Sequence, residues 1–338
     1  MESVPYAEGD RVDVSANARL TGVVLVTGGT GSFGKTIVRR LLAEPGVEKI
    51  RVFSRDEGKQ DALREEHGNN PRIELVTGDV RDPESIESAM RGARWVFHAA
   101  ALKQVPNCER FPVEAVRTNA LGSENVRRAA VRCQPEAVVA ISTDKACAPI
   151  NAMGISKAMM ERILLRTQEP RNNTRFVCVR YGNVIGSRGS VVPLFLDRVR
   201  QGSPLPITDP TMTRFLLDLS EAVELSLAAI LGGRHGQVWV KKMPAATIAD
   251  LAAAVSPRPD YPRETIGVRP GEKLHEVLVN EEEMRRTEER GDFFIIYPGA
   301  RDQDLSAPTA REYTSRSTDR LDVAGVRRML ERAGLVPA

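Results

Sequence analysis

The chain has 338 residues, 41% of them apolar, and its 48 Lys and Arg side chains nearly balance its 45 Asp and Glu side chains. This composition excludes intrinsic disorder, a collagen-like helix and a small disulfide-stapled scaffold, and the length predicts one large domain or two interleaved domains. No block of Lys and Arg could neutralise a run of phosphates, so a nucleic-acid partner is not expected.

The four cysteines and the first 20 residues bear on the cellular compartment. The cysteines are widely spaced, without a C-x-x-C pair or a nearby His, so we expect reduced thiols and no metal site. No apolar run approaches the ~20 residues of a membrane span, and residues 1–20 look like a polar tail rather than a signal peptide. We therefore expect a cytoplasmic protein without a membrane partner.

From Gly22 onward, short β-branched runs alternate with longer amphipathic stretches. The predicted strands lie at 23–26, 50–53, 73–76, 95–100, 137–142, 175–181 and 237–240. The predicted helices begin near Phe33 and Glu57 and span 113–133 and 151–167. Continuous apolar strands separated by such helices are typical of a parallel sheet covered on both faces. The fold class is α/β, a Rossmann-like doubly wound parallel sheet with a smaller C-terminal substrate lobe.

The regular alternation ends near Gly186, where Gly and Pro become frequent, as expected where loops and a smaller lobe build a substrate site. The charged stretch at 281–290 is interpreted as a solvated helix. The expected segments are a polar N-terminal tail (1–20), an NADP-binding Rossmann domain (21–185 and about 215–242), a substrate lobe (about 186–214 and 243–300) and a C-terminal tail and helix (301–338).

A glycine-rich turn follows the first predicted strand directly and opens a helix. Its glycines permit a tight turn and close backbone approach, and the free N–H groups at the helix start attract a pyrophosphate. In this context the turn predicts a dinucleotide site. The candidate contacts from the turn are Gly28, Thr30, Gly31, Ser32, Phe33 and Gly34.

The end of the second strand bears on the choice between NAD and NADP. Arg55 lies where a lone acid would bind the ribose of NAD, and a guanidinium suits a 2′-phosphate. Ser54 and Lys59 add donors, so the sequence favours NADP, whereas Asp56 keeps NAD as the alternative. Further candidates near the dinucleotide, which plain loop geometry explains equally well, are Asp79, Val80, Ala99, Ala100 and Ala101.

A polar segment follows the predicted strand that ends at Ser142. Ligands bind beyond the carboxyl ends of the strands in an open α/β sheet, so Asp144, Lys145 and, on the next helix, Lys157 are expected near the cofactor. Asp144 can act as an acid, and Lys145 as a base if burial and neighbouring charge lower its pKa. An ordinary Asp–Lys loop pair is the alternative.

Seven ordered motifs resemble those of a known family: TGGTGSFGK (27–35), SRDEGKQ (54–60), HAAALKQVP (98–106), STDKA (142–146), PINAMGISK (149–157), RYGNVIGSRGSVVP (180–193) and RPGEKLHE (269–276). Together they resemble the UDP-N-acetylglucosamine 4,6-dehydratases of the extended short-chain dehydrogenase/reductase superfamily. The match is to the inverting, 5-epimerising type of capsule and polysaccharide biosynthesis. It spans about residues 22–276 and, more weakly, 312–315. It implies a lyase with a UDP-sugar substrate in a homo-oligomer.

The resemblance also implies a mechanism. NADP⁺ would oxidise C4 of the hexose, and the ketone would acidify C5–H. A base then removes the C5 proton while an acid expels the C6 hydroxyl, and hydride returns to C6. The family's Asp-Lys pair matches Asp144 as the acid and Lys145 as the C5 base. Retaining relatives carry Asp-Glu there, so Lys145 implies inversion at C5.

One position departs from the superfamily pattern, because Tyr-x-x-x-Lys reads Met153-Gly-Ile-Ser-Lys157 here. The i, i+4 spacing keeps both side chains on one helical face, but a thioether cannot accept the proton of the C4 hydroxyl. The Met resembles a similar departure in the capsule-type branch. Lys157 can still bind the nicotinamide ribose, and Thr143, Asp144 or a water held by Lys157 are candidates to replace the phenol.

The remaining motifs match the family's nucleotide-sugar site, and the fork geometry of Arg suits a diphosphate. The residues that the resemblance places there are Lys103, Asn183, Val191, Val192, Arg214, Arg269 and Glu272. Three alternatives stay open: a C5-retaining dehydratase, a C4 epimerase, and a non-catalytic NADP-binding sensor. Lys145 argues against the first two, and the retained Asp144–Lys145 pair argues against the third.

Overall fold

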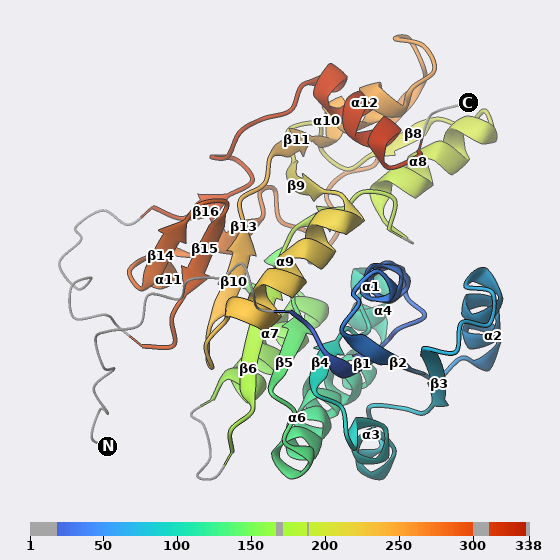
Figure 1. Ribbon diagram of the computed structural model, residues 1–338. Coiled ribbons are helices and arrows are strands. Elements are labelled where there is room, and N and C mark those ends of the chain that lie inside the picture. Colours follow the sequence, from blue (N-terminus) through green and yellow to red (C-terminus); the bar gives the residue numbers. More distant parts are fainter. Residues whose placement is uncertain (1–18, 167–171, 188, 300–310, 336–338) are drawn as a thin grey trace.

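The computed structural model describes residues 19–166, 172–187, 189–299 and 311–335. Most of the expected N-terminal tail (1–20) and parts of the expected C-terminal segment (301–310 and 336–338) lie outside this range. The centre is a sheet of nine strands in the order β14-β15-β10-β6-β5-β4-β1-β2-β3 (Figure 1). These strands are β1 (Gly22–Thr27), β2 (Val47–Ser54), β3 (Ile73–Thr77), β4 (Trp95–His98), β5 (Ala137–Ile141), β6 (Arg175–Arg180), β10 (Val238–Lys241), β14 (Thr287–Arg290) and β15 (Phe293–Ile296).

The sheet is parallel from β10 to β3, and only β15 and β14 add antiparallel pairs at one edge. Every residue of β5 is buried, as expected for a strand covered on both faces. The predicted doubly wound α/β architecture is confirmed. The helices between its strands are α1 (Ser32–Leu42), α2 (Glu57–Glu66), α3 (Pro83–Met90), α6 (Gly122–Cys133), α7 (Ala152–Leu165) and α9 (Leu219–Gly232).

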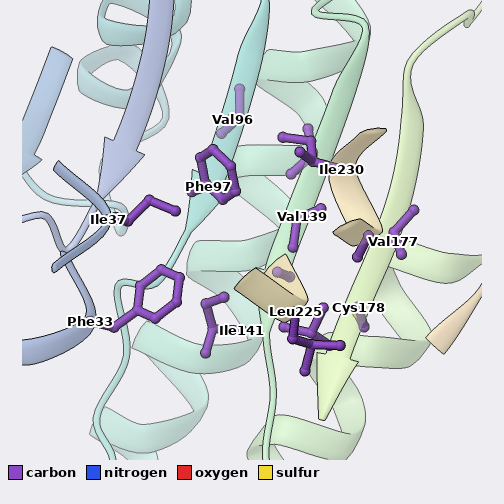
Figure 2. Packing of buried hydrophobic residues seen from close by; sticks show 14 of the residues in the cluster. Phe33, Ile37, Val96, Phe97, Val139, Ile141, Val177, Cys178, Leu225 and Ile230 are labelled. Atoms are coloured by element: carbon purple, nitrogen blue, oxygen red, sulfur yellow. The ribbon is translucent and has the colours of Figure 1, made fainter. Parts of the chain in front are cut away.

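Two rows of helices cover the sheet. Helix α1 packs against α9, whereas α3, α6 and α7 pack in a second row. Figure 2 shows Phe33 of α1 and Leu225 of α9 lying against the central strands, which carry Phe97, Val139 and Ile141, all in one hydrophobic cluster. Each such side chain contributes roughly 1.5–3 kcal/mol by leaving water, so the helix that follows the glycine turn is firmly held on the sheet.

The predicted helix at 113–133 is one helical stretch in three parts. It consists of α5 (Pro112–Ala115), the π-helical segment η1 (Val116–Leu121) and α6. Helix α4 (Val105–Arg110) precedes it, and a single 3₁₀ turn, η2 (Asp144–Ala146), follows β5.

A smaller lobe lies beyond one end of the main sheet, with α8, α10 and α12 gathered there in Figure 1. It has its own hydrophobic cluster, to which Phe195, Leu251 and Met329 belong. Two small sheets, in the orders β11-β9-β7 and β12-β8, belong to it. Its elements are β7 (Asn183–Val184), α8 (Val191–Arg200), β8 (Leu205–Ile207), β9 (Thr213–Leu217), β11 (Ala245–Thr247), α10 (Ile248–Val255), β12 (Arg263–Thr265) and α12 (Val323–Arg332).

A third small sheet lies beside β14 and β15 at the edge of the main sheet (Figure 1). It consists of β13 (Val277–Val279) and β16 (Tyr313–Thr314), and the short helix α11 (Glu281–Met284) follows β13. Leu278 and Val279 of β13 pack in the hydrophobic cluster of the main sheet.

Several expected boundaries differ from the structure. Strands β14 and β15 come from the stretch assigned to the substrate lobe (243–300), yet they extend the main sheet because Ile295 and Ile296 pack in its core. Strand β9 lies in a small sheet, although most of it was assigned to the Rossmann domain. The solvated helix expected at 281–290 is wrong, because the helix ends at Met284, a strand follows, and Glu283 is buried.

Within the described ranges, no helix has the length and apolar character needed to cross a bilayer.

Candidate active site

A cleft of about 1300 Å³ lies at the carboxyl ends of the parallel strands, between the main sheet and the smaller lobe. The turns after β1 to β6 line one side, and residues of α8, β8, β9 and the 269–276 segment line the other. This is where an open α/β sheet binds its ligands. Of the predicted site residues, the structure brings all but Val192 to the lining of this one cleft.

The glycine turn leaves room for a ligand because side chains are excluded from it. Gly28 has φ of +67°, and a Cβ there would lie 2.7 Å from the backbone N of Ala100. A Cβ on Gly34 would lie 2.4 Å from backbone atoms of Gly29. Gly31 is the N-cap of α1 and brings no side chain to the first N–H groups of the helix. The turn therefore fits a pyrophosphate bound by backbone donors.

The charged side chains after β2 differ in how firmly their neighbours bind them. Asp56 caps α2 by accepting from the Lys59 N–H at 3.0 Å, and it also pairs with the Lys59 ammonium. Arg55 is half-exposed, with Nη1 3.6 Å from Asp79 Oδ2, and Asp79 binds Arg81 more closely at 2.6 Å. The guanidinium at the mouth of the cleft is thus held loosely, while the neighbouring acid is already engaged.

The Asp-Lys pair forms part of a larger buried group. Thr143 donates to Asp144 Oδ1 at 2.7 Å and caps η2. The Lys145 ammonium lies 3.1 Å from Asp144 Oδ1 and equally 3.1 Å from Glu276 Oε1. Arg214 Nε lies 3.8 Å from the same Glu276 oxygen. The cleft thus holds two carboxyl groups, an ammonium and a guanidinium in contact.

Burial and charge set the protonation of this group. Burial raises the pKa of Asp144 by more than the Lys145 charge lowers it. Burial alone would lower the pKa of Lys145, but the charges of Asp144 and Glu276 outweigh it and raise that pKa. The prediction of Lys145 as a base assumed that its pKa is lowered, and this assumption is wrong. The pKa is raised because Glu276 adds a second negative charge, which the spacing of the motifs did not reveal.

Lys157 and Met153 lie one helical turn apart on α7 and both line the cleft. The Lys157 ammonium donates to the carbonyl of Ile141 at 2.8 Å and contacts Met160 Sδ at 3.4 Å. Burial lowers the pKa of Lys157 to about 8. Met153 is buried in a small cluster with Cys108 and Ala115, so it fills space where the superfamily places a phenol.

Most of the residues expected at the nucleotide-sugar lie on the lobe side of the cleft, whereas Lys103 comes from the segment after β4. Val192 does not line the cleft, because it lies about 100° around α8 from Val191 and packs in the core of the smaller lobe. The predicted residues that do line the cleft here are Lys103, Asn183, Val191, Arg214, Arg269 and Glu272.

Sequence reasoning missed Glu276 and Tyr181 in the lining. Glu276 ends the motif at 269–276, in which only Arg269 and Glu272 were singled out. Tyr181 follows β6, and its backbone carbonyl accepts from the Asp144 N–H at 3.1 Å. The rule that ligands lie beyond strand ends could have found Tyr181. In the part of the chain that is described, no group of three His, Cys, Asp or Glu side chains is arranged for a metal ion.

The chain is similar to a known family, to curated relatives and to solved structures. Residues 24–298 match the family described as "Polysaccharide biosynthesis protein". A "UDP-glucose 4-epimerase" of Rickettsia massiliae is 45% identical over 91% of this chain and 94% of its own length. The crystal structure of Pen from Bacillus thuringiensis is 35% identical with a TM-score of 0.84, over 92% of this chain and 98% of that one. A UDP-glucose 4-epimerase from Thermus thermophilus, solved with NAD, is 25% identical with a TM-score of 0.64, over 74% of this chain and 88% of that one.

Proposed function

Because the chain belongs to the polysaccharide biosynthesis protein family and has the extended short-chain dehydrogenase/reductase fold of nucleotide-sugar epimerases and dehydratases, we propose that it is a UDP-N-acetylglucosamine 4,6-dehydratase that inverts C5. Its product is a UDP-6-deoxy-4-keto-hexosamine for polysaccharide or glycoconjugate biosynthesis. The contact between Asp144 and Lys145 in the cleft carries the proposal. Elimination of water needs an acid and a base together, whereas C4 epimerisation needs neither at C5 and C6.

The residues of the chain have distinct tasks in this reaction. The Lys145 ammonium first passes a proton to the adjacent Asp144 carboxylate, 3.1 Å away, which leaves a neutral acid beside a free amine. That amine takes the C5 proton as the C5–C6 double bond forms. Asp144 gives its proton to the C6 hydroxyl, which leaves as water when the C6–O bond breaks. A proton then returns to C5 from the opposite face, which gives inversion. Thr143 fixes the Asp144 carboxyl by donating to Oδ1, so that Oδ2 is left to face the sugar.

The cofactor of this proposal is NADP. When bound, the nicotinamide supplies a hydride acceptor for C4 and a hydride donor for C6. The turn from Gly28 to Gly34 would hold the pyrophosphate, as its excluded side chains and uncapped N–H groups support. Arg55 would pair with a 2′-phosphate, since it is half-exposed while Asp56 is engaged as a helix cap.

The UDP-sugar would be bound mainly by residues on the lobe side of the cleft. Arg214 and Arg269 would bind the diphosphate, with Lys103 near the sugar or the nicotinamide and Asn183 and Val191 near the nucleoside. Lys157 would hold the nicotinamide ribose. Its amine contacts a carbonyl and a thioether, which carry no charge, so a ribose hydroxyl is a suitable further partner.

A C4 epimerase is the second candidate, because the Rickettsia relative carries that name at 45% identity. The two functions are separated by incubating the protein with NADP and UDP-N-acetylglucosamine, and in parallel with UDP-glucose. We expect mass spectrometry to show a product lighter by one water from UDP-N-acetylglucosamine. A product of unchanged mass that is the C4 epimer would instead establish the epimerase. Tight cofactor binding without turnover of either sugar would establish a sensor.

We also propose that the protein is a homo-oligomer. An apolar surface, here called the helical patch, covers neighbouring helical segments: α5 and η1 pack against α7. Ile155 and Met159 lie one turn apart on α7, so both face the same way. Large exposed apolar patches on a water-facing surface mark interaction sites. The members of the helical patch, each 46–59% exposed, are Val113, Val116, Leu121, Ile155 and Met159.

A further inference from the structure

Lys145 is shared between two carboxyl groups that come from distant parts of the chain. Its ammonium lies 3.1 Å from Asp144 Oδ1, in the adjacent residue, and 3.1 Å from Glu276 Oε1, in the segment that leads into β13. Both carboxyl side chains are almost fully buried, with exposures of 1% and 2%, whereas Lys145 keeps 21% exposure toward the cleft. The two buried carboxyl groups thus bind the ammonium, and its exposed part faces the cleft.

The second oxygen of each carboxyl group has no hydrogen-bond partner among the described residues. These atoms, Asp144 Oδ2 and Glu276 Oε2, are both buried. An unpartnered buried carboxyl oxygen is costly, and such atoms persist where a ligand or a proton completes them. A proton on Asp144 would let this carboxyl group donate to a substrate hydroxyl at the cleft.

The backbone of Glu276 is anchored on both sides, which fixes the point from which its side chain reaches Lys145. The Glu276 N–H donates to the Ser315 hydroxyl at 2.8 Å, and the Ser315 N–H donates to the Glu276 carbonyl at 2.9 Å. The same hydroxyl lies 2.7 Å from Thr213 Oγ1 of β9. The weakly matching segment at 312–315 therefore has a physical task, because it fixes the place of Glu276.

We propose that Glu276 is the positioning residue that holds the Lys145 amine beside Asp144 and stays the charged partner of Lys145, so that Asp144 keeps the proton it gives to the leaving hydroxyl. This role rests on the proposed dehydration. Glu276 acts through Lys145 and Asp144 rather than on the sugar itself.

The charges around Lys145 support a charged Glu276 and a protonated Asp144. Burial alone would raise the pKa of Glu276, but Lys145, Arg214 and Lys273 outweigh it and lower that pKa. The negative charge of Glu276 in turn raises the pKa of Asp144 and of Lys145. On the adjacent helix α7, the Lys157 amine is bound to the carbonyl of Ile141, and Glu161 is paired with the buried Arg180.

The first test is the pH dependence of single-turnover dehydration in the full-length protein with saturating NADP and UDP-N-acetylglucosamine. Glu276→Gln removes one negative charge beside both the acid and the base, so both limbs of the bell-shaped profile should move to lower pH. A charge at this distance shifts a pKa by about 1–3 units, which sets the expected displacement. Glu276→Asp keeps the charge and should restore the position of the profile, even with a lower maximum.

The second test needs no substrate. The pKa of Lys145 is measured by NMR titration of ¹³C-labelled lysine, with the signal assigned by its loss in Lys145→Ala. We expect a lower pKa for Lys145 in Glu276→Gln than in the parent protein or in Glu276→Asp. Glu281→Gln is the matched control, because Glu281 is 64% exposed on α11 and pairs with Arg285, away from Lys145.

The two tests separate the outcomes. A Glu276→Gln protein with an unchanged Lys145 pKa and an unmoved, merely lower profile would overturn the role of Glu276 and leave the dehydratase intact. A lowered Lys145 pKa in a protein that removes no water from the sugar would support the charge pairing and overturn the proposed function. If Glu276→Gln does not fold, a Glu276→Asp profile displaced from that of the parent would contradict the proposal, since the charge is retained.

Discussion

The residues of the cleft fall into two kinds: side chains that exchange protons and side chains that only pack and position the substrate. Lys145 contacts Asp144 at 3.1 Å and faces the cleft, so it can exchange a proton with the sugar. Met153 has no exchangeable proton and is buried with Cys108 and Ala115. Loss of each side chain should therefore have a different kinetic cost.

Lys145→Ala should lower the single-turnover rate by about 100- to 10,000-fold, the usual contribution of general acid–base catalysis. Met153→Ala should lose less, because it removes packing and substrate position but no proton acceptor. Lys157→Ala should also be damaging, through cofactor placement. The rates are measured at saturating NADP and UDP-sugar so that weak binding is not mistaken for lost chemistry. Equal losses from Lys145→Ala and Met153→Ala, with both proteins folded, would contradict this division.

Arg55→Ala should remove most of the preference for NADP over NAD, because the half-exposed guanidinium would lose its pairing with the 2′-phosphate. Calorimetric titration of both cofactors into the parent and the variant measures this preference. Arg64→Ala is the control, since Arg64 is an equally exposed Arg on α2 paired with Asp61. Equal affinities of the parent protein for the two cofactors would show that Arg55 does not bind the 2′-phosphate.

At the scale of elements, one buried cluster joins β6, α7, α11 and the residue that follows β5. Arg180 at the end of β6 pairs with Glu161 of α7 at 2.6 Å and with Glu283 of α11 at 2.8 Å. Ser142, directly after β5, also donates to Glu161 at 2.5 Å. The cluster therefore fixes the strand ends that carry Thr143, Asp144 and Tyr181.

Removing one partner of this cluster should be costly. Glu283→Ala removes the two hydrogen bonds that Arg180 donates to this carboxylate, while Glu161 still compensates the charge of Arg180. Because hydrogen bonds to charged groups contribute about 1.5–3 kcal/mol, we expect the unfolding free energy to fall by an amount in that range. Urea denaturation at neutral pH measures the loss. Glu281→Ala, in the same helix but exposed, should change the unfolding free energy by less than about 0.5 kcal/mol. A loss of similar size in both variants would mean that the cluster does not fasten α11.

The elements show which parts of the fold could be predicted from the sequence. Strands such as β5 are continuous apolar runs, so their place in a covered parallel sheet follows from pattern alone. The glycine turn and the Asp144–Lys145 pair could be placed at the strand ends by the same reasoning. Glu283 looked like part of a solvated charged run, because its partner Arg180 lies 103 residues away in sequence.

The same limit explains the corrections in the cleft. Burial would lower the pKa of Lys145, but the charges of Asp144 and then Glu276 raise it. Glu276 lies 131 residues away in sequence and is brought to Lys145 because β13, which it precedes, packs against η2. Val192 was grouped with Val191 in a motif, but a helix turns neighbouring side chains to different faces. Local pattern gives secondary structure and candidate residues, whereas long-range contacts decide the charge and the orientation of each.

The whole molecule combines a main sheet and a smaller lobe around one cleft, and the helical patch lies on helices that flank the sheet. Light scattering should give a mass of at least two chains of 37.1 kDa at micromolar concentration. The double variant Val113→Glu/Ile155→Glu places charges in the helical patch and should give single chains. Ile266→Glu, an exposed apolar position outside the patch, is the control. A single-chain mass for the parent protein would rule out the proposed homo-oligomer.

If the cleft removes water from UDP-N-acetylglucosamine and inverts C5, the product formed in deuterated water has a distinctive NMR spectrum. We expect a 4-keto sugar with a C6 methyl group, deuterium at C5 and the L configuration there. A product that keeps its C6 hydroxyl and is inverted only at C4 would rule out the dehydratase and establish the epimerase.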